Sequence, residues 1–187
     1  MSERRVAVYG GSFDPPHLGH VLSVAWAMST GEVEETWVVP TWEHAFEKTH
    51  EAPFDERMAM CELAFSPFRR AEVLDIERSL GGTSRTLHTL EALAASHPDT
   101  SFRLLVGADV LPTTDRWHRW EEVARIAPPL VVGREGYPQP ADCPIAIPNV
   151  NSTAVRAALS SDADIAHLVP GAVAEHIRAR GLYASLA

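Results

Sequence analysis

The sequence predicts an α/β protein built on a doubly wound parallel sheet, with helices on both faces. Five short runs, rich in β-branched residues, are apolar almost throughout, as is typical of strands that are buried on both faces. These runs alternate with segments whose apolar residues recur at helical spacing. In chain order, the predicted strands are residues 5–10, 36–40, 71–75, 102–107 and 129–133.

Two of the intervening segments, residues 17–30 and 84–96, predict helices with one apolar stripe each. The stripe residues are Leu18, Val21, Leu22 and Ala25 in the first segment and Leu87, Leu90 and Leu93 in the second.

The helix ends and the C-terminal part of the chain agree with this order. Two glycines stand where left-handed caps end helices, and two prolines stand near helix starts. The glycines are Gly31 and Gly181, and the prolines are Pro53 and Pro170. Residues 134–148 hold four prolines and predict a surface excursion. Residues 149–187 predict two helices that form a C-terminal helical closure.

Composition favours a single domain over residues 1–187, because 45% of the residues are hydrophobic and can form a sizeable core. The two cysteines are too far apart for a local metal site and too few for a disulfide framework, which favours a reducing compartment.

No stretch reads as a signal peptide or a membrane span. A formal net charge of −9 disfavours binding to nucleic acid or to an anionic membrane. We therefore expect a cytoplasmic protein with neither partner, and the sequence leaves a homo-oligomer open.

The loop after the first predicted strand holds the densest group of functional candidates. Ligands of a doubly wound sheet bind beyond the carboxyl ends of its strands, and residues 8–20 there read VYGGSFDPPHLGH. Gly10 and Gly11 lack Cβ atoms, so a phosphate can approach their N–H groups. His17 and His20 lie in the first turn of a helix whose free N–H groups and dipole favour an anion. The motif therefore predicts a phosphate site.

The stretch GGSFDPPHLGH resembles the ATP-binding signature of the nucleotidylyltransferase superfamily, specifically of the bacterial nicotinate-nucleotide adenylyltransferases. The spacing fits neither a dehydrogenase G-x-G-x-x-G nor a P-loop, and the two histidines lack further zinc ligands. Segments that resemble the family follow in order over essentially the full chain: VGADVL, RWHRWEEV, VVGREGY, VNSTAVR and LVPGAVAEHIRARGLY. The resemblance implies a Rossmann-like fold in the pyridine-nucleotide branch of the superfamily.

By resemblance, the activity is transfer of the adenylyl group of ATP, with Mg²⁺, to nicotinate mononucleotide, a step of NAD biosynthesis that releases pyrophosphate. Nicotinamide mononucleotide as acceptor, or a non-catalytic nucleotide sensor on the same fold, are the alternatives. The attacking phosphate is already ionised near neutral pH, because a phosphate monoester has a second pKa of about 6. Positioning and charge stabilisation can then suffice without a general base. We expect His17, His20 and Arg156 to provide them, with His20 at the α-phosphate.

For ATP, the resemblance implies a site that joins the first loop, the end of the fourth predicted strand and the segment NSTAVR. Ser152 can cap a helix whose next turn presents Arg156 on the same face. Asp109 would lie near the riboses. No metal site made of protein ligands is expected. The full expected set is Gly10, Gly11, Ser12, Phe13, His17, Gly19, His20, Gly107, Asp109, Ser152, Thr153 and Arg156.

For the acceptor, the resemblance implies the loop PTWEHAFEK, the stretch Ser84-Arg85-Thr86, and Trp117, whose ring can stack on a pyridine. The loop is more aromatic than in the family, and Arg85 stands where the family has tyrosine. Arg85 would favour a nicotinate carboxylate if it points inward and would be a solvated helix residue if it points outward. The expected acceptor set is His44, Lys48, Arg85, Thr86 and Trp117.

Overall fold

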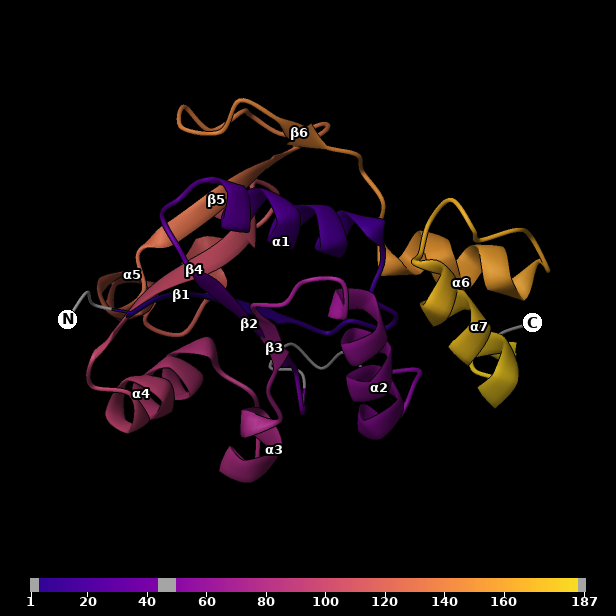
Figure 1. Cartoon of the computed structure of the whole chain (residues 1–187), viewed down its shortest axis with the longest axis horizontal. Helices are drawn as coiled ribbons and strands as arrows, with labels where there is room; N and C mark the ends of the chain where they lie inside the picture. Colours follow the sequence, from indigo (N-terminus) through magenta and orange to yellow (C-terminus); the bar gives the residue numbers. More distant parts are fainter. Residues whose placement is uncertain (1–3, 44–49, 185–187) are drawn as a thin grey trace.

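A six-stranded parallel sheet runs through the centre of the molecule in a computed structural model that describes residues 4–43 and 50–184 (Figure 1). The strands are β1 Arg4–Gly11, β2 Glu35–Pro40, β3 Ala71–Val73, β4 Thr100–Gly107, β5 Pro129–Arg134 and β6 Ala146–Ile147. Their order is β3-β2-β1-β4-β5-β6, and every neighbouring pair is parallel. This order is that of a doubly wound sheet, which confirms the predicted fold class.

Helices connect the strands and close the C-terminal end. Their bounds are α1 Leu18–Ser29, α2 Phe54–Phe65, α3 Ile76–Leu80, α4 Thr86–Ser96, the 3₁₀ turn η1 Leu111–Arg116, α5 Trp120–Ile126, α6 Ser152–Ser160 and α7 Gly171–Arg180. The helices α6 and α7 are the two predicted for the C-terminal segment, and they lie beside each other next to α2 (Figure 1). Within the described ranges, every helix is too short or too polar to cross a membrane.

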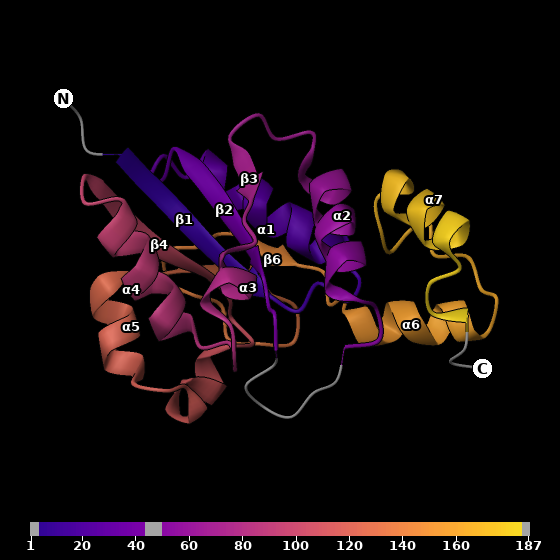
Figure 2. The same cartoon turned by 90° about the horizontal axis from the view of Figure 1, so that it is seen from below.

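Successive residues of the central strands point to opposite faces of the sheet and enter two separate cores. Val6 and Val8 of β1 pack with the leucines of α4 and with α5, whereas Ala7 and Tyr9 pack with α1, α2, α6 and α7. Figure 2 shows α4 and α5 on one face and α1 behind the sheet on the other. Both faces of these strands are therefore covered, which is why they read as continuous apolar runs.

Two local expectations were wrong, the end of the third strand and the buried face of α1. The third strand ends at Val73 rather than at residue 75. The 134–148 segment is mostly exposed, as expected of a surface excursion, and it also contributes the short strand β6. The predicted stripe of α1 is not its buried face: Leu22 is 43% exposed, whereas Val24 and its neighbours face the core. Two adjacent stripes of α1 are apolar, and packing against the sheet selects the second one.

The carboxylate of Asp14, only 4% exposed, ties the loop after β1 to two distant parts of the chain. It accepts hydrogen bonds from the N–H groups of Glu51 and Ala52 at 2.7 and 3.1 Å and from the hydroxyl of Tyr183 at 2.7 Å. Three donors compensate for the loss of hydration that burial imposes on the carboxylate. The loop is thereby held against the start of α2 and the end of the α7 segment.

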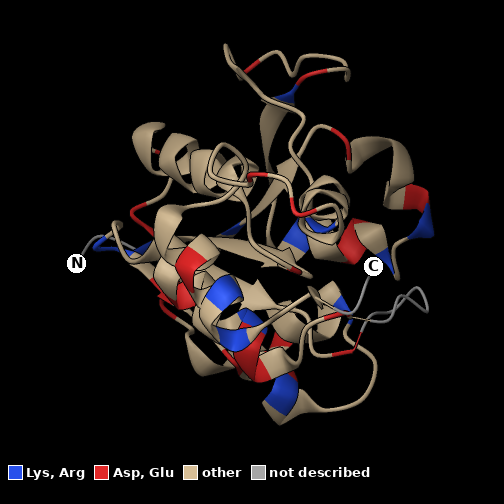
Figure 3. Cartoon of the chain, turned by 90° about the vertical axis from the view of Figure 1, so that its right-hand side faces the viewer, with Lys and Arg blue, Asp and Glu red and all other residues tan. Residues whose placement is uncertain are grey.

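Two further contacts reinforce this anchorage. The guanidinium of Arg57 in α2, which is 1% exposed, donates to the carbonyls of Ser12 at 2.8 Å and Ala52 at 3.3 Å. Helix α7 is paired with α2 through Glu56, whose carboxylate lies 2.7 Å from Nε2 of His176 and also accepts from Arg180. Seen from the α6 and α7 side, acidic and basic residues are interspersed along the ribbon (Figure 3). The C-terminal helices therefore act as a support for the loop after β1.

We expect Tyr183→Phe to lower the free energy of unfolding by about 1.5–3 kcal/mol, because it removes a hydrogen bond to a buried charged group. Urea denaturation measures this difference. Tyr137→Phe is the matched control, because Tyr137 is 40% exposed and its substitution is expected to change stability by less than about 0.5 kcal/mol. A Tyr183→Phe protein as stable as the control would contradict the role given to Asp14.

Candidate active site

The loop after β1 turns at Phe13 rather than at the glycines. Strand β1 stays paired with β2 through Gly11, and Phe13 has a positive φ of 46°. This left-handed conformation is unfavourable for a side-chain-bearing residue, and the buried Phe13 ring compensates by packing against Tyr9, His20 and Phe65. A Cβ atom at Gly11 would lie 3.1 Å from that ring. Phe13 therefore occupies the space where a Gly11 side chain would lie, whereas the corresponding space at Gly10 is open, and phosphate binding at both glycines stays a prediction.

His17 and His20 stack on each other, with ring centroids 3.7 Å apart. The backbone N–H of His17 donates to Nδ1 of His20 at 3.1 Å. Since Nδ1 of His20 is the acceptor, the proton of its neutral ring sits on Nε2. A Cβ at Gly19 would lie 3.0 Å from the His17 ring, so the glycine of the motif allows the stack.

Burial lowers the pKa of both imidazoles. The pKa of His17, which is 3% exposed, falls from 6.5 to about 3 through desolvation and then through the charge of Arg134. For His20, desolvation, the neighbouring His17 and Arg134 lower the pKa well below 6.5. Both rings are therefore neutral in the ligand-free protein at physiological pH, and a neutral imidazole can stabilise a phosphate as a hydrogen-bond donor.

The start of α1 is less open than predicted. The N–H of Leu18 donates to the carbonyl of Leu168 at 2.8 Å, and the N–H of His17 is used by His20. The N–H of His20 donates back to His17 at 2.9 Å. The expectation that this helix end offers a row of free N–H groups is wrong for these three residues, because Leu168 and groups within the first turn of the helix already accept from them.

Helix α6 brings Ser152 and Arg156 to the histidine loop. The hydroxyl of Ser152 donates to the carbonyl of Pro15 at 2.9 Å, and Nη1 of Arg156 donates to the carbonyl of Asp14 at 2.6 Å. The predicted cap is wrong: Asn151 caps α6 by accepting from the N–H of Ala154 at 2.9 Å. This frees the Ser152 hydroxyl for the loop. Thr153, also predicted, is exposed on α6.

Sequence reasoning gave no role to Arg134, which lies at the carboxyl end of β5. Its guanidinium donates to the carbonyl of Val150 at 2.8 Å and approaches Oδ1 of Asp109 at 3.7 Å. A Cβ at Gly107 would lie 2.3 Å from that Asp109 oxygen, so Gly107 makes room for the carboxylate. The available signal was the strand end itself, where ligand-binding residues of doubly wound sheets gather.

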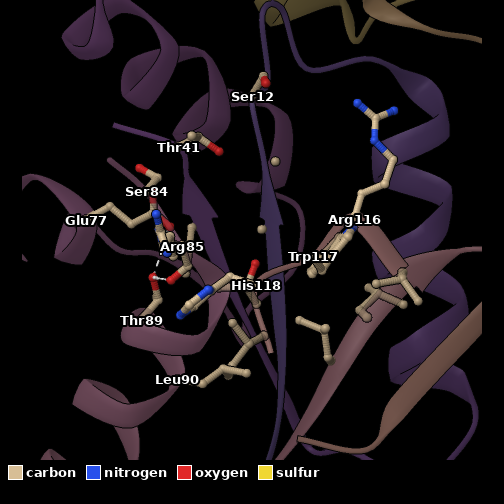
Figure 4. Close-up of a pocket in the computed structure, with 18 residues that line it drawn as sticks. Ser12, Thr41, Glu77, Ser84, Arg85, Thr89, Leu90, Arg116, Trp117 and His118 are labelled. Atoms are coloured by element: carbon tan, nitrogen blue, oxygen red, sulfur yellow. Dashed lines mark hydrogen bonds between the residues drawn. The ribbon is translucent and has the colours of Figure 1, made fainter. Parts of the chain in front are cut away.

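A cavity of about 440 Å³ opens beside the histidine loop at the centre of the sheet (Figure 4). Its walls come from β1, β4, the end of β2 and the segment after it, α3, the start of α4 and the end of η1. Residues predicted for ATP or acceptor that line it are Gly10, Gly11, Ser12, Arg85, Thr86 and Trp117. Sequence reasoning missed its carboxylate, Glu77, and read its second arginine, Arg116, as solvated surface, whereas the structure places both residues in the cavity wall.

The cavity gathers most of the predicted acceptor residues. Trp117 is half-buried and packs edge-to-face on Trp120, with centroids 5.5 Å apart, while Arg85 is exposed and still lines the cavity. His44 and Lys48 lie outside the described residues. Across the described ranges, no three His, Cys, Asp or Glu side chains are grouped so as to hold a metal ion.

Comparison with known proteins places this geometry in a family. The family described as cytidylyltransferase-like matches residues 8–161. Probable nicotinate-nucleotide adenylyltransferases of Anaeromyxobacter sp. (strain K) and Myxococcus xanthus (strain DK1622) are 42% and 37% identical to the chain, covering 96% of it and 97% and 94% of their own lengths. Among solved structures, Plasmodium falciparum nicotinic acid mononucleotide adenylyltransferase complexed with NaAD shares the fold, with a TM-score of 0.82 at 19% identity over 96% of this chain and 97% of that one.

These matches span the histidine loop, the strand ends and α6, so they confirm the resemblance that the motifs indicated. The chain belongs to the cytidylyltransferase-like family, among the relatives of the nicotinate-nucleotide adenylyltransferases.

Proposed function

We propose that the protein transfers the adenylyl group of MgATP to nicotinate mononucleotide, giving nicotinate adenine dinucleotide and pyrophosphate. The observation that carries this proposal is the juxtaposition of the His17–His20 loop with a large cavity that holds an aromatic ring and two arginines. Relatives up to 42% identical over nearly the full chain bear the name of this activity. Mg²⁺ enters as part of the substrate MgATP.

The triphosphate is assigned to the histidine loop and the start of α6. Nδ1 of His20 accepts from the backbone N–H of His17, so Nε2–H is the one donor that the neutral His20 ring can offer to a phosphate. Arg156 uses one N–H on the carbonyl of Asp14, and a guanidinium has five donors, so others remain for phosphate oxygens. His17, Ser152 and Thr153 complete this side of the proposed site, and Asp109 with Arg134 forms the side nearer the nucleoside.

The reaction needs no general base in this arrangement. An oxygen of the acceptor phosphate attacks the α-phosphorus, a new P–O bond forms, and the bond to the bridging oxygen breaks with its electron pair leaving on pyrophosphate. The attacking oxygen is ionised above a pKa of about 6, and imidazoles with a lowered pKa are weak bases. The protein then contributes alignment and hydrogen bonds to the oxygens where charge develops.

The acceptor is assigned to the cavity. The face of Trp117 suits stacking with a pyridine ring, and Arg85 at the cavity wall suits a carboxylate. Lys48 and His44 remain predictions for the acceptor phosphate.

The direct test is pyrophosphate release by the purified protein with ATP, Mg²⁺ and nicotinate mononucleotide, together with identification of the dinucleotide product. We expect turnover with this acceptor and slower turnover with nicotinamide mononucleotide. ATP binding without pyrophosphate release for either acceptor would make the protein a nucleotide sensor and contradict the proposal.

We expect His20→Asn to lower kcat by about 10²–10³-fold, because it removes a donor that stabilises developing charge, while the KM for ATP changes far less. Asparagine keeps an acceptor near the position of Nδ1, so the cap on His17 can persist. His167→Asn, at an exposed position, is the matched control. Unchanged turnover in His20→Asn would remove His20 from the mechanism.

The lowered pKa values predict a flat pH profile of kcat/KM for MgATP between about pH 7 and 9. This profile reports the pKa values of the free enzyme. His17, with a pKa of about 3, stays neutral throughout, and the His20 pKa lies well below 6.5. A fall in kcat/KM with an apparent pKa between about 6 and 8 would mean that the reaction requires an imidazolium, contrary to this account.

Arg85→Ala is expected to reduce the preference for nicotinate over nicotinamide mononucleotide several-fold, because an exposed charge pair contributes at most about 1 kcal/mol. The ratio of the two kcat/KM values measures this preference. Arg125→Ala, an exposed arginine on α5, serves as control. An unchanged ratio in Arg85→Ala would mean that Arg85 does not recognise the carboxylate.

A further inference from the structure

Glu77 of α3 is a buried carboxylate in the wall of the cavity, and neither the histidine loop nor the proposed chemistry uses it. The residue is 8% exposed. Its Oε2 accepts from the backbone N–H of Trp42 at 3.1 Å, and its Oε1 accepts from the hydroxyl of Thr89 at 3.0 Å. Figure 4 shows Glu77 reaching toward Thr89 at the cavity wall. One side chain therefore joins the segment after β2 to helix α4.

The segment that Glu77 holds is part of a short seam. The hydroxyl of Ser84 accepts from the N–H groups of Trp42 and Glu43 at 3.0 and 3.2 Å, and the N–H of Ser84 donates to the carbonyl of Glu43 at 2.9 Å. Glu43 also forms a β-bridge with Thr83. The seam sets the position of the chain just before Arg85 and Thr86, which line the cavity.

The Trp42 side chain is fixed from the other side. Its ring packs on Phe54 at 4.9 Å between centroids, and the guanidinium of Arg78 lies 5.5 Å from it. Glu77 adds a contact to the backbone of the same residue, because its Oε2 accepts from the N–H of Trp42. Without this carboxylate, the N–H of Trp42 would keep only Ser84 as partner, and the hydroxyl of Thr89 would keep only the carbonyl of Arg85 at 3.4 Å.

A carboxylate is an unexpected choice for a cavity that receives an anionic acceptor. The hydrogen bonds of Glu77 explain why a carboxylate is present. Each of its oxygens has a donor partner within 3.1 Å, and burial of a carboxylate without partners would be strongly unfavourable. We propose that Glu77 is a positioning residue that fixes the two walls of the acceptor cavity relative to each other, by accepting hydrogen bonds and not by exchanging a proton. This inference rests on the proposed assignment of the cavity to the acceptor.

Two substitutions separate hydrogen bonding from charge. Glu77→Met keeps the length of the side chain and removes both acceptors. Glu77→Gln can keep both contacts, because its amide oxygen accepts from Trp42 and its amide N–H donates to the Thr89 oxygen, whose own hydroxyl hydrogen turns to the carbonyl of Arg85. We expect Glu77→Met to raise the KM for nicotinate mononucleotide about tenfold or more with little change in the KM for ATP, and Glu77→Gln to stay close to the wild-type values.

Three results would overturn the inference. Equal impairment of Glu77→Gln and Glu77→Met would show that the charge itself is required. Wild-type behaviour of Glu77→Met would show that the contacts are dispensable. An equal rise of both KM values, or a loss of kcat alone, would show a general structural effect. Glu91→Met, at an exposed position of α4, is the matched control.

Thr89→Val supplies a second route if Glu77→Met does not fold. It removes the hydroxyl partner with little change of shape, and we expect a smaller rise in the same KM. Where Glu77→Met folds, its effect and that of Thr89→Val should not add in the double variant, because the residues share one contact; additive effects would contradict the proposed connection.

Calorimetric titration of nicotinate mononucleotide distinguishes failure of this inference from failure of the proposed function. If the wild type binds this ligand but releases no pyrophosphate, the function fails, and the dissociation constants of the Glu77 variants still test the positioning role. If the wild type binds no pyridine mononucleotide, both proposals fail at the assignment of the cavity.

Discussion

The buried carboxylate of Asp14 is the constraint on which the site depends. It lies in the loop that leaves the central strand, and its partners come from the start of α2 and from Tyr183, 169 positions further along the chain. Arg57 donates to the carbonyl of Ser12, two residues before it, and Arg156 donates to the backbone carbonyl of Asp14 itself. A carboxylate removed from water requires these donors, so the loop reaches its conformation only when the C-terminal helices are in place. The C-terminal closure thus belongs to the site.

This anchorage explains how a weakly basic pair of histidines can serve phosphate chemistry. His17 stacks on His20, and desolvation together with the charge of Arg134 lowers the pKa values of both rings. In the proposed function, Arg156, Arg134 and Mg²⁺ supply the positive charge for a triphosphate, while His20 contributes a directed N–H. The arginines would then provide electrostatic attraction, which weakens as the salt concentration rises. His20 would provide alignment, which does not depend on salt.

Much of the fold could be predicted because the central strands are covered on both faces and therefore read as unbroken apolar runs. The face of α1 could not, since two adjacent stripes are apolar and only packing selects between them. At the site, the motif located the histidines, and local chemistry allowed either Asn151 or Ser152 as the cap of α6, because both are good capping residues. Arg134 is marked only by its place at the end of a predicted strand, and Glu77 has no local signal, because the contacts of both residues form between loops that meet only in the folded chain.

The proposed chemistry depends most directly on the loop presenting His20 as a neutral imidazole with its proton on Nε2. Nitrogen NMR of the protein labelled with ¹⁵N in its histidine rings, with His20 assigned by comparison with His20→Asn, measures this directly. At pH 7, with and without a non-hydrolysable ATP analogue, the account predicts a protonated Nε2 and an unprotonated Nδ1 for His20. Protonation of both nitrogens, or of Nδ1 alone, would contradict it.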